Sequence, residues 1–87
     1  MNKMIKKPTS LFVGIIHQKD DKDDFVDVRF ITINEKQAQI EMTIAKEYAI
    51  KKLKLKCVIE RDNYAFFISN NKMKTYEVFY IERLIIR

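Results

Sequence analysis

The sequence predicts an α+β domain in which one helix packs on a small antiparallel sheet of five or six strands, in the order ββαβββ. Three observations predict this fold. Apolar and polar side chains alternate along several short segments, as they do along strands. Residues 35–52 combine strong helix formers with one apolar face. The 87-residue chain has a single glycine and a single proline, which favours long regular elements over many tight turns.

The first strand is predicted after a basic N-terminal segment. Residues 1–9 are polar and basic, and we expect them to be a flexible lead-in to a single domain that spans residues 10–87. Residues 10–17 carry apolar side chains on both faces of a strand. This pattern is typical of a central strand rather than an exposed edge.

A hairpin is predicted to follow, because the next segment is strongly polar. Residues 18–24 include four aspartates and read as the hairpin loop. Residues 25–33 then alternate with a period of two, which predicts the second strand. On one face of that strand we expect Val26, Val28 and Phe30.

Two interpretations are open for residues 35–56. The first is one helix over about 35–52, because Asn34 and Gln37 resemble a capping box and small and apolar residues share one helical face. The second is a strand at 37–44 followed by a short helix at 45–52, because apolar residues also alternate there. That alternative gives the order βββαββ, which is compatible with a small OB-like barrel. The helical face of the first interpretation consists of Ala38, Met42, Ala45, Ala49 and Leu53.

The C-terminal part is predicted to be all strand. From residue 53 the period becomes two, with Leu53, Leu55, Cys57 and Ile59 facing inward. Asp62-Asn63 and Asn70-Asn71 predict turns, because Asn tolerates a positive φ. The last strand, 75–86, is apolar on both faces, which indicates a buried strand or an interface.

Several chemistries are excluded by residue type and spacing. Gly14 alone cannot form a glycine-rich phosphate-binding loop. Cys57 is the only cysteine, so it forms no internal disulfide and no cysteine-based zinc site, and it reads as a small buried apolar side chain. His17 has no nucleophile motif near it, and the aspartates of 18–24 lack EF-hand spacing. We therefore expect no catalytic residue, no metal site and no cofactor.

The binding residues are predicted from charge. The formal net charge is +5, and the segment 46–56 holds the densest run of lysines. Lysine-rich surfaces attract phosphate backbones, and aromatic side chains on strands can stack on bases. A solvent-exposed lysine face beside core aromatics is the competing interpretation. The predicted binding residues are Lys51, Lys52, Lys54, Lys56, Arg61 and Tyr64.

We therefore expect a small non-enzymatic, cytoplasmic binding protein that contacts nucleic acid or a nucleoprotein through a lysine-rich face. The alternative is an inhibitor or adaptor that binds a host or defence protein, so the partner is nucleic acid or an acidic protein surface. Abundant Lys, Ile, Asn, Phe and Tyr indicate an AT-rich gene, as in low-GC bacteria and their phages. No segment has the roughly 20 apolar residues of a membrane helix. Two-sided apolar strands in so short a chain predict a homodimer.

Overall fold

The computed structural model describes residues 9–85, which form five strands and one helix in the predicted order ββαβββ. Of the predicted lead-in, residues 1–8 lie outside the described residues, and Thr9 already begins the first strand. The elements are β1 (Thr9–Lys19), β2 (Asp24–Thr32), α1 (Glu35–Lys51), β3 (Lys56–Arg61), β4 (Tyr64–Ile68) and β5 (Thr75–Ile85).

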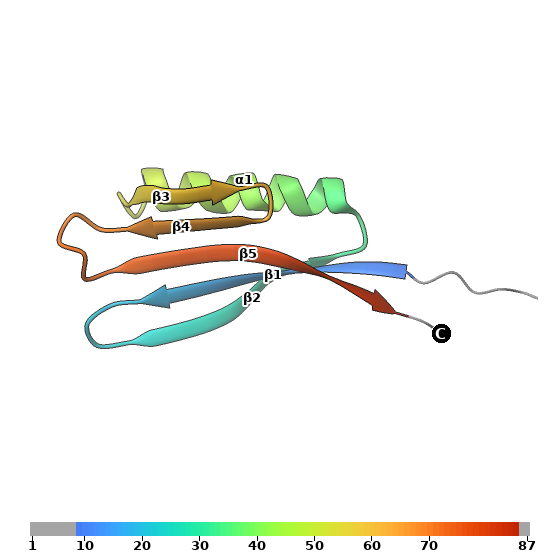
Figure 1. Ribbon diagram of the computed structural model, residues 1–87, viewed down its shortest axis with the longest axis horizontal. Helices are drawn as coiled ribbons and strands as arrows, with labels where there is room; N and C mark the ends of the chain where they lie inside the picture. The colour runs from blue at the N-terminus through green and yellow to red at the C-terminus, as the bar shows by residue number, and fades with distance from the viewer. Residues whose placement is uncertain (1–8, 86–87) are drawn as a thin grey trace, which may run out of the picture.

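The sheet is antiparallel throughout, with the strand order β2-β1-β5-β4-β3. The hairpin β1–β2 and the meander β3–β4–β5 meet where β1 pairs with β5. The helix connects the two edge strands, β2 and β3, and it runs back along one face of the sheet (Figure 1). The OB-like alternative is therefore wrong, because residues 37–44 are helical and the sheet ends in two separate edges.

The helix forms where the single-helix interpretation placed it. The Asn34 side chain accepts hydrogen bonds from the backbone N–H groups of Lys36, at 2.9 Å, and Gln37, at 3.3 Å. These bonds satisfy two of the donors that a helix N-terminus leaves unpaired. The predicted apolar face is confirmed, since its members pack against aromatic side chains of the sheet. Four of them, Ala38, Met42, Ala45 and Ala49, are fully buried.

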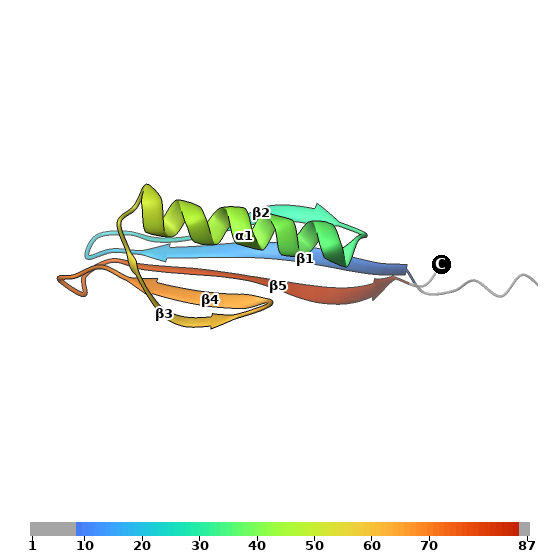
Figure 2. The ribbon, with the colours of Figure 1, turned by 90° about the horizontal axis from the view of Figure 1, so that it is seen from above.

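The face of the sheet under the helix holds the core. Its strand residues include Phe12 of β1, Phe67 of β4 and Tyr76, Val78 and Tyr80 of β5, none more than 5% exposed. Three of the four buried helix residues are alanines, so the helix approaches the sheet closely over the aromatic rings. Turning the view shows that α1 lies on one side of the sheet only (Figure 2).

A bulge in β2 corrects the predicted face of that strand. Gly14 of β1 pairs with Phe30, but the next residue, Ile15, pairs with Val28, so Arg29 is the extra residue. The side chains of β2 therefore change faces at Arg29. Phe30 points to the helix side and lies over Gly14, while Val26 and Val28 point to the opposite side. A Cβ atom on Gly14 would overlap the Phe30 ring, so this position requires glycine.

The connection from α1 to β3 also differs from the prediction. The strand begins at Lys56, and Lys54 lies before it in a left-handed turn with φ of 58°. Leu55 is buried and donates its backbone N–H to Ala49, so it belongs to the helix end. A bulge between Cys57 and Ile59 then sends Ile59 to the face away from the helix. The prediction of one strand from residue 53 to 59, with every second side chain facing inward, is therefore wrong.

The turn between β4 and β5 uses asparagine in an unexpected way. The residue with positive φ is Lys72, at 62°, and not Asn70 or Asn71. The side chain of Asn71 instead accepts hydrogen bonds from the Met73 backbone N–H and the Ser69 hydroxyl. Its contribution is a hydrogen-bond acceptor for the loop rather than an unusual backbone conformation.

Candidate binding surfaces

The structure separates the predicted binding residues into two groups. Lys51 ends α1, Lys52 caps it, Lys54 lies in the following turn and Lys56 begins β3, and all four are exposed. Arg61 and Tyr64 lie at the other end of the β3–β4 hairpin, where they are paired across the turn. Lys56 and Arg61 are five residue steps apart, which separates the groups by about 16 Å along the strand.

Three connections meet at the end of the molecule that carries the first group. The β1–β2 loop, the β4–β5 loop and the segment from α1 to β3 all lie at the left of Figure 1. They bring further lysines beside the predicted ones, which sequence reasoning missed because the grouping depends on strand topology. The lysines of this end, called the lysine end below, are Lys19, Lys22, Lys51, Lys52, Lys54, Lys56, Lys72 and Lys74.

Lys46 belongs to the same sequence run but not to the lysine end. Its ammonium group donates to the backbone carbonyl of Arg61 at 3.0 Å and pairs with the Glu60 carboxylate at 3.2 Å. These contacts join the side of α1 to β3. This lysine is therefore used inside the fold, whereas the salt bridges found among the described residues include none of the eight lysines.

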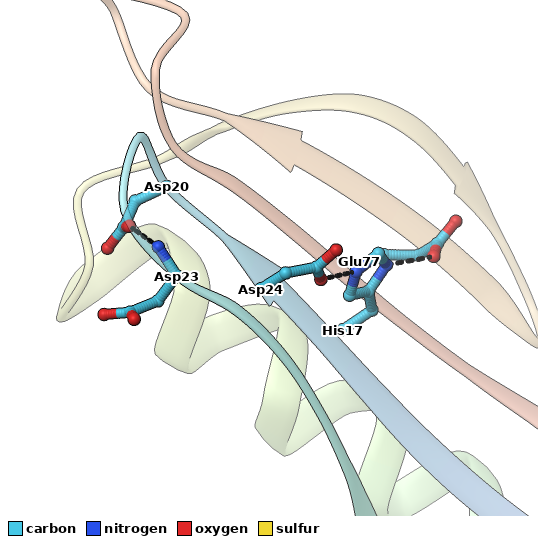
Figure 3. A network of polar contacts seen from close by, with 5 residues as sticks. All are labelled: His17, Asp20, Asp23, Asp24 and Glu77. Carbon is cyan, nitrogen blue, oxygen red and sulfur yellow. Dashed lines mark hydrogen bonds and ion pairs between the residues drawn. The ribbon is translucent and has the colours of Figure 1, made fainter.

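The aspartates at the lysine end have local structural contacts. The Asp20 carboxylate accepts the backbone N–H groups of Lys22, at 2.8 Å, and Asp23, at 2.7 Å, and these bonds lower the pKa of Asp20. Asp24 points away from them and pairs with His17 (Figure 3). Within residues 9–85, no three His, Cys, Asp or Glu side chains are grouped so that they could hold a metal ion.

A groove of about 580 Å³ opens at the lysine end, between the β1–β2 hairpin and the end of the helix. Its floor is apolar, formed by Phe25, Leu53, Leu55 and Tyr76. Its rim carries both signs of charge, from Lys19, Lys74, Asp20, Asp23 and Asp24. Because the rim carries both signs of charge, the groove itself has no strong preference for anions. The positive electrostatic potential at this end comes mainly from the lysines outside the groove.

The second surface is the face of the sheet away from α1, called the open face below. In the part of the chain that the structure describes, no element covers it (Figure 2). Strand register places apolar side chains there in adjacent rows across the sheet. The apolar and aromatic residues of these rows are Val26, Val28 and Ile31 of β2; Val13 and Ile15 of β1; Phe79 and Ile81 of β5; Tyr64 and Phe66 of β4; and Ile59 of β3. The same face carries the charged or polar residues His17, Lys19, Lys56, Arg61, Glu77 and Arg83.

One row of polar side chains crosses the open face. His17 on β1 contacts the Asp24 carboxylate of β2 through Nε2 and lies 3.5 Å from the Glu77 carboxylate of β5 through Nδ1 (Figure 3). The Tyr64 hydroxyl of β4 donates to the other oxygen of Glu77. The hydrogen bond to Asp24 raises the pKa of His17, and the hydrogen bond to Glu77 raises the pKa of Tyr64.

Sequence reasoning treated His17 as a strand-end residue beside a loop and did not find this row. Its members lie at positions 17, 24, 64 and 77, and only the register of four strands brings them together. The pairing of Asp24 with His17 could have been anticipated from the short β1–β2 hairpin. The contributions of Glu77 and Tyr64 depend on long-range pairing that no local pattern reports.

Comparison with known proteins gives no assignment: no family model matches the sequence, and no curated protein or solved structure matches the chain. The described residues contain no helix with both the length and the apolar character needed to cross a membrane.

Proposed function

We propose that this chain is a cytoplasmic, non-enzymatic binding protein that contacts nucleic acid through the lysine end. The observation that supports the proposal is the convergence of three connections, which gather eight lysines against four aspartates at one end of the fold. Phosphate backbones bind such surfaces because each lysine that neutralises a phosphate releases condensed counterions. Lys51, Lys52 and Lys54 are fully available for such contacts, since each is exposed.

Arg61 and Tyr64 extend the proposed contact along the sheet. Arg61 is exposed, and the Tyr64 ring lies 6.2 Å from the Phe79 ring on the open face. Aromatic side chains on an exposed sheet stack on unpaired bases, and arginine adds a cationic partner. A single strand that starts at the lysine end would reach these residues along β3. This favours single-stranded nucleic acid over a duplex.

The chemistry of the only histidine and the only cysteine supports a non-enzymatic role. Both ring nitrogens of His17 face carboxylates, so neither is directed at a nucleophile or at an open pocket. The Cys57 thiol donates to the Ile59 carbonyl at 3.5 Å, and burial raises its pKa, which disfavours the reactive thiolate. General acid–base or nucleophilic catalysis requires groups that are free to act on a substrate.

The second candidate function, a protein inhibitor or adaptor, is favoured by a different observation. The open face exposes branched aliphatic side chains, such as Val28 and Ile31, at 53% and 61%. Contiguous exposed apolar surface marks protein interfaces. An acidic protein could also bind the lysine end, in which case binding would be insensitive to nuclease and would have a defined stoichiometry.

Charge reversal at the lysine end tests the proposed function. The test variant is the double variant Lys52→Glu/Lys54→Glu, which reverses the charge of two exposed side chains. Lys46 is not suitable as a control position, because its side chain has contacts in the fold. Lys36→Glu alone is the control, since Lys36 is exposed in the first turn of α1, at the far end of the helix. Fluorescence anisotropy with mixed-sequence single-stranded oligonucleotides, RNA and DNA, would be recorded from 50 to 300 mM salt.

The wild type should bind with an affinity that falls with salt. The double variant should bind about 10-fold or more weakly at low salt, with a salt slope smaller by about one for each lost phosphate contact. The control should bind like the wild type. Equal weakening by Lys36→Glu would show that only net charge matters, and absence of binding by the wild type would overturn the proposal in favour of a protein partner.

A further inference from the structure

The open face departs from what a water-facing sheet usually shows. An antiparallel sheet with one solvated face normally alternates apolar residues inward with polar residues outward. Here the outward residues in the middle of β1 and β5 are themselves apolar, with Val13 and Ile15 on β1 beside Phe79 and Ile81 on β5. The edge strand β2 continues the same rows with Val28 and Ile31. The apolar surface is therefore contiguous across three strands.

Its size matches one side of a dimer interface. The strands contain eleven, nine, six, five and eleven residues. At about 3.3 Å per residue and 4.8 Å between strands, the face has a projected area of about 650 Å². Side chains that stand out from the sheet add to this, and a standard stable interface takes roughly 800 Å² from each partner. The open face thus supplies most of the area that a stable dimer needs.

The distribution of charge favours a second copy as the occupant. The chain carries a net charge of +5, which opposes self-association if the charge lies on the contacting surface. Eight lysines against four aspartates place most of the excess at the lysine end, where Lys19 and Lys56 border the apolar rows of the open face. Inside the face, the charge of His17 is accompanied by the carboxylates of Asp24 and Glu77. The other cations of the face lie at its margins, Arg61 on the edge strand β3 and Arg83 near the end of β5. The apolar centre between them is complementary to itself, as a two-fold interface requires.

We propose that two copies of this chain pack open face to open face. The resulting dimer has four layers, with the two sheets inside and one helix on each outer side, and its sheets pack about 10 Å apart. The copies run in opposite directions, so that the two lysine ends lie at opposite ends of the dimer. The interface leaves Lys51, Lys52 and Lys54 outside it, so either form can make the proposed nucleic-acid contact at the lysine end. It covers Tyr64 and Arg61, so the contact along β3 is made by the single copy only.

Matched substitutions at exposed isoleucines test the interface. Ile81 lies on the open face and is 41% exposed, whereas Ile44 lies on the outer side of α1 and is 46% exposed. Ile81→Glu places a carboxylate in the proposed contact, and Ile44→Glu adds the same charge at a similar exposure on the opposite side of the molecule. Sedimentation equilibrium from 1 to 300 µM would measure the association constant of each, with far-UV circular dichroism to verify folding.

The wild type and Ile44→Glu should dimerise, and Ile81→Glu should weaken dimerisation at least 100-fold, since an unpaired carboxylate would be desolvated in an apolar interface. A monomeric wild type at 300 µM would overturn the proposal. So would a dimer that Ile44→Glu disrupts and Ile81→Glu does not, because the outer side of the helix would then be the interface.

A second measurement covers the case in which Ile81→Glu fails to fold. A soluble paramagnetic agent broadens methyl signals that are accessible to solvent. In the wild-type dimer the Val28 and Ile31 methyls should be protected, although both are more than half exposed in one copy, while the Ile40 and Ile44 methyls on the helix should broaden. Equal broadening of both sets at 300 µM would contradict the interface.

Discussion

Phe66 and Phe67 are neighbours on β4, and they point to opposite faces of the sheet. Phe67 is fully buried beneath α1, with its ring 6.0 Å from that of Tyr76. Phe66 lies half-buried on the open face, in the same row as His17 and Glu77. The same strand therefore contributes to a completed core and to an uncovered surface. The comparison shows that a strand with apolar residues on both sides can be covered on one side only within a single copy; in the dimer proposed above, the second copy supplies the other layer.

Substitution of Phe66 and Phe67 should give the largest difference in stability between the open face and the covered face. Phe67→Ala removes a fully buried ring, and we expect it to lower the free energy of unfolding by about 3–5 kcal/mol. Phe66→Ala should cost less, about 1 kcal/mol at low micromolar protein, since that ring is already partly exposed in one copy. Urea denaturation monitored by circular dichroism measures both values.

The protein concentration makes this comparison sharper. If the open face is a dimer interface, the cost of Phe66→Ala should grow as the concentration rises, because the wild type gains stability from association. The cost of Phe67→Ala should grow much less. Equal costs for the two variants at low concentration would mean that the open face is covered within a single copy.

A second difference between the faces concerns Gly14, which lies on the covered side of β1. The Phe30 ring lies against its backbone, so a methyl group there must displace the ring. We expect Gly14→Ala to destabilise the fold by about 1–3 kcal/mol, the usual cost of overpacking. Thermal or urea unfolding checks this value.

The double variant Gly14→Ala/Phe30→Leu tests the cause. A smaller side chain at position 30 leaves room for the new methyl group. Gly14→Ala should therefore lower the free energy of unfolding less in the Phe30→Leu protein than in the wild type. Additive losses would indicate that β-strand geometry, rather than the ring contact, makes glycine necessary.

Local signals in the sequence account for most of the secondary structure. The Asn34 cap and the alanine-rich face located α1, and the order ββαβββ followed from period-two segments separated by polar turns. Local patterns failed where an extra residue was inserted. The bulges at Arg29 and between Cys57 and Ile59 each reverse the faces of the residues beyond them, and alternation alone contains no sign of this reversal.

The candidate surfaces were less predictable than the fold. Lys51 to Lys56 are close in sequence and are also close in space, so their grouping was recognisable. Lys19, Lys22, Lys72 and Lys74 join them only because three connections lie at one end of the sheet. The polar row on the open face depends on the register of four strands. Such surfaces follow from topology, which the order of elements restricts but does not determine.

The smallest expected effect is on the open face, at His17. Asp24 on β2 and Glu77 on β5 flank the ring, and Tyr64 on β4 donates to Glu77; these are the groups that face the row. The hydrogen bond to Asp24 raises the pKa of His17 above its ordinary value of 6.5. Protonated His17 is therefore favoured in the folded state. Its contribution to stability is fully present below about pH 6.5 and is lost as the pH rises through the raised folded-state pKa.

The variant His17→Gln should accordingly be less stable than the wild type at pH 6, and the difference should shrink towards pH 9. Measurements are kept above about pH 5. Since His17 is the only histidine in the sequence, the ring signals of untagged protein in a proton NMR titration report its pKa directly. A folded-state pKa at or below 6.5, or a stability difference that widens as the pH rises, would contradict the favourable pairing with Asp24. Because the polar row is exposed to solvent in one copy, screening keeps the stability difference between the wild type and His17→Gln small. A larger difference at concentrations where the protein dimerises would place His17 inside the interface of the open faces.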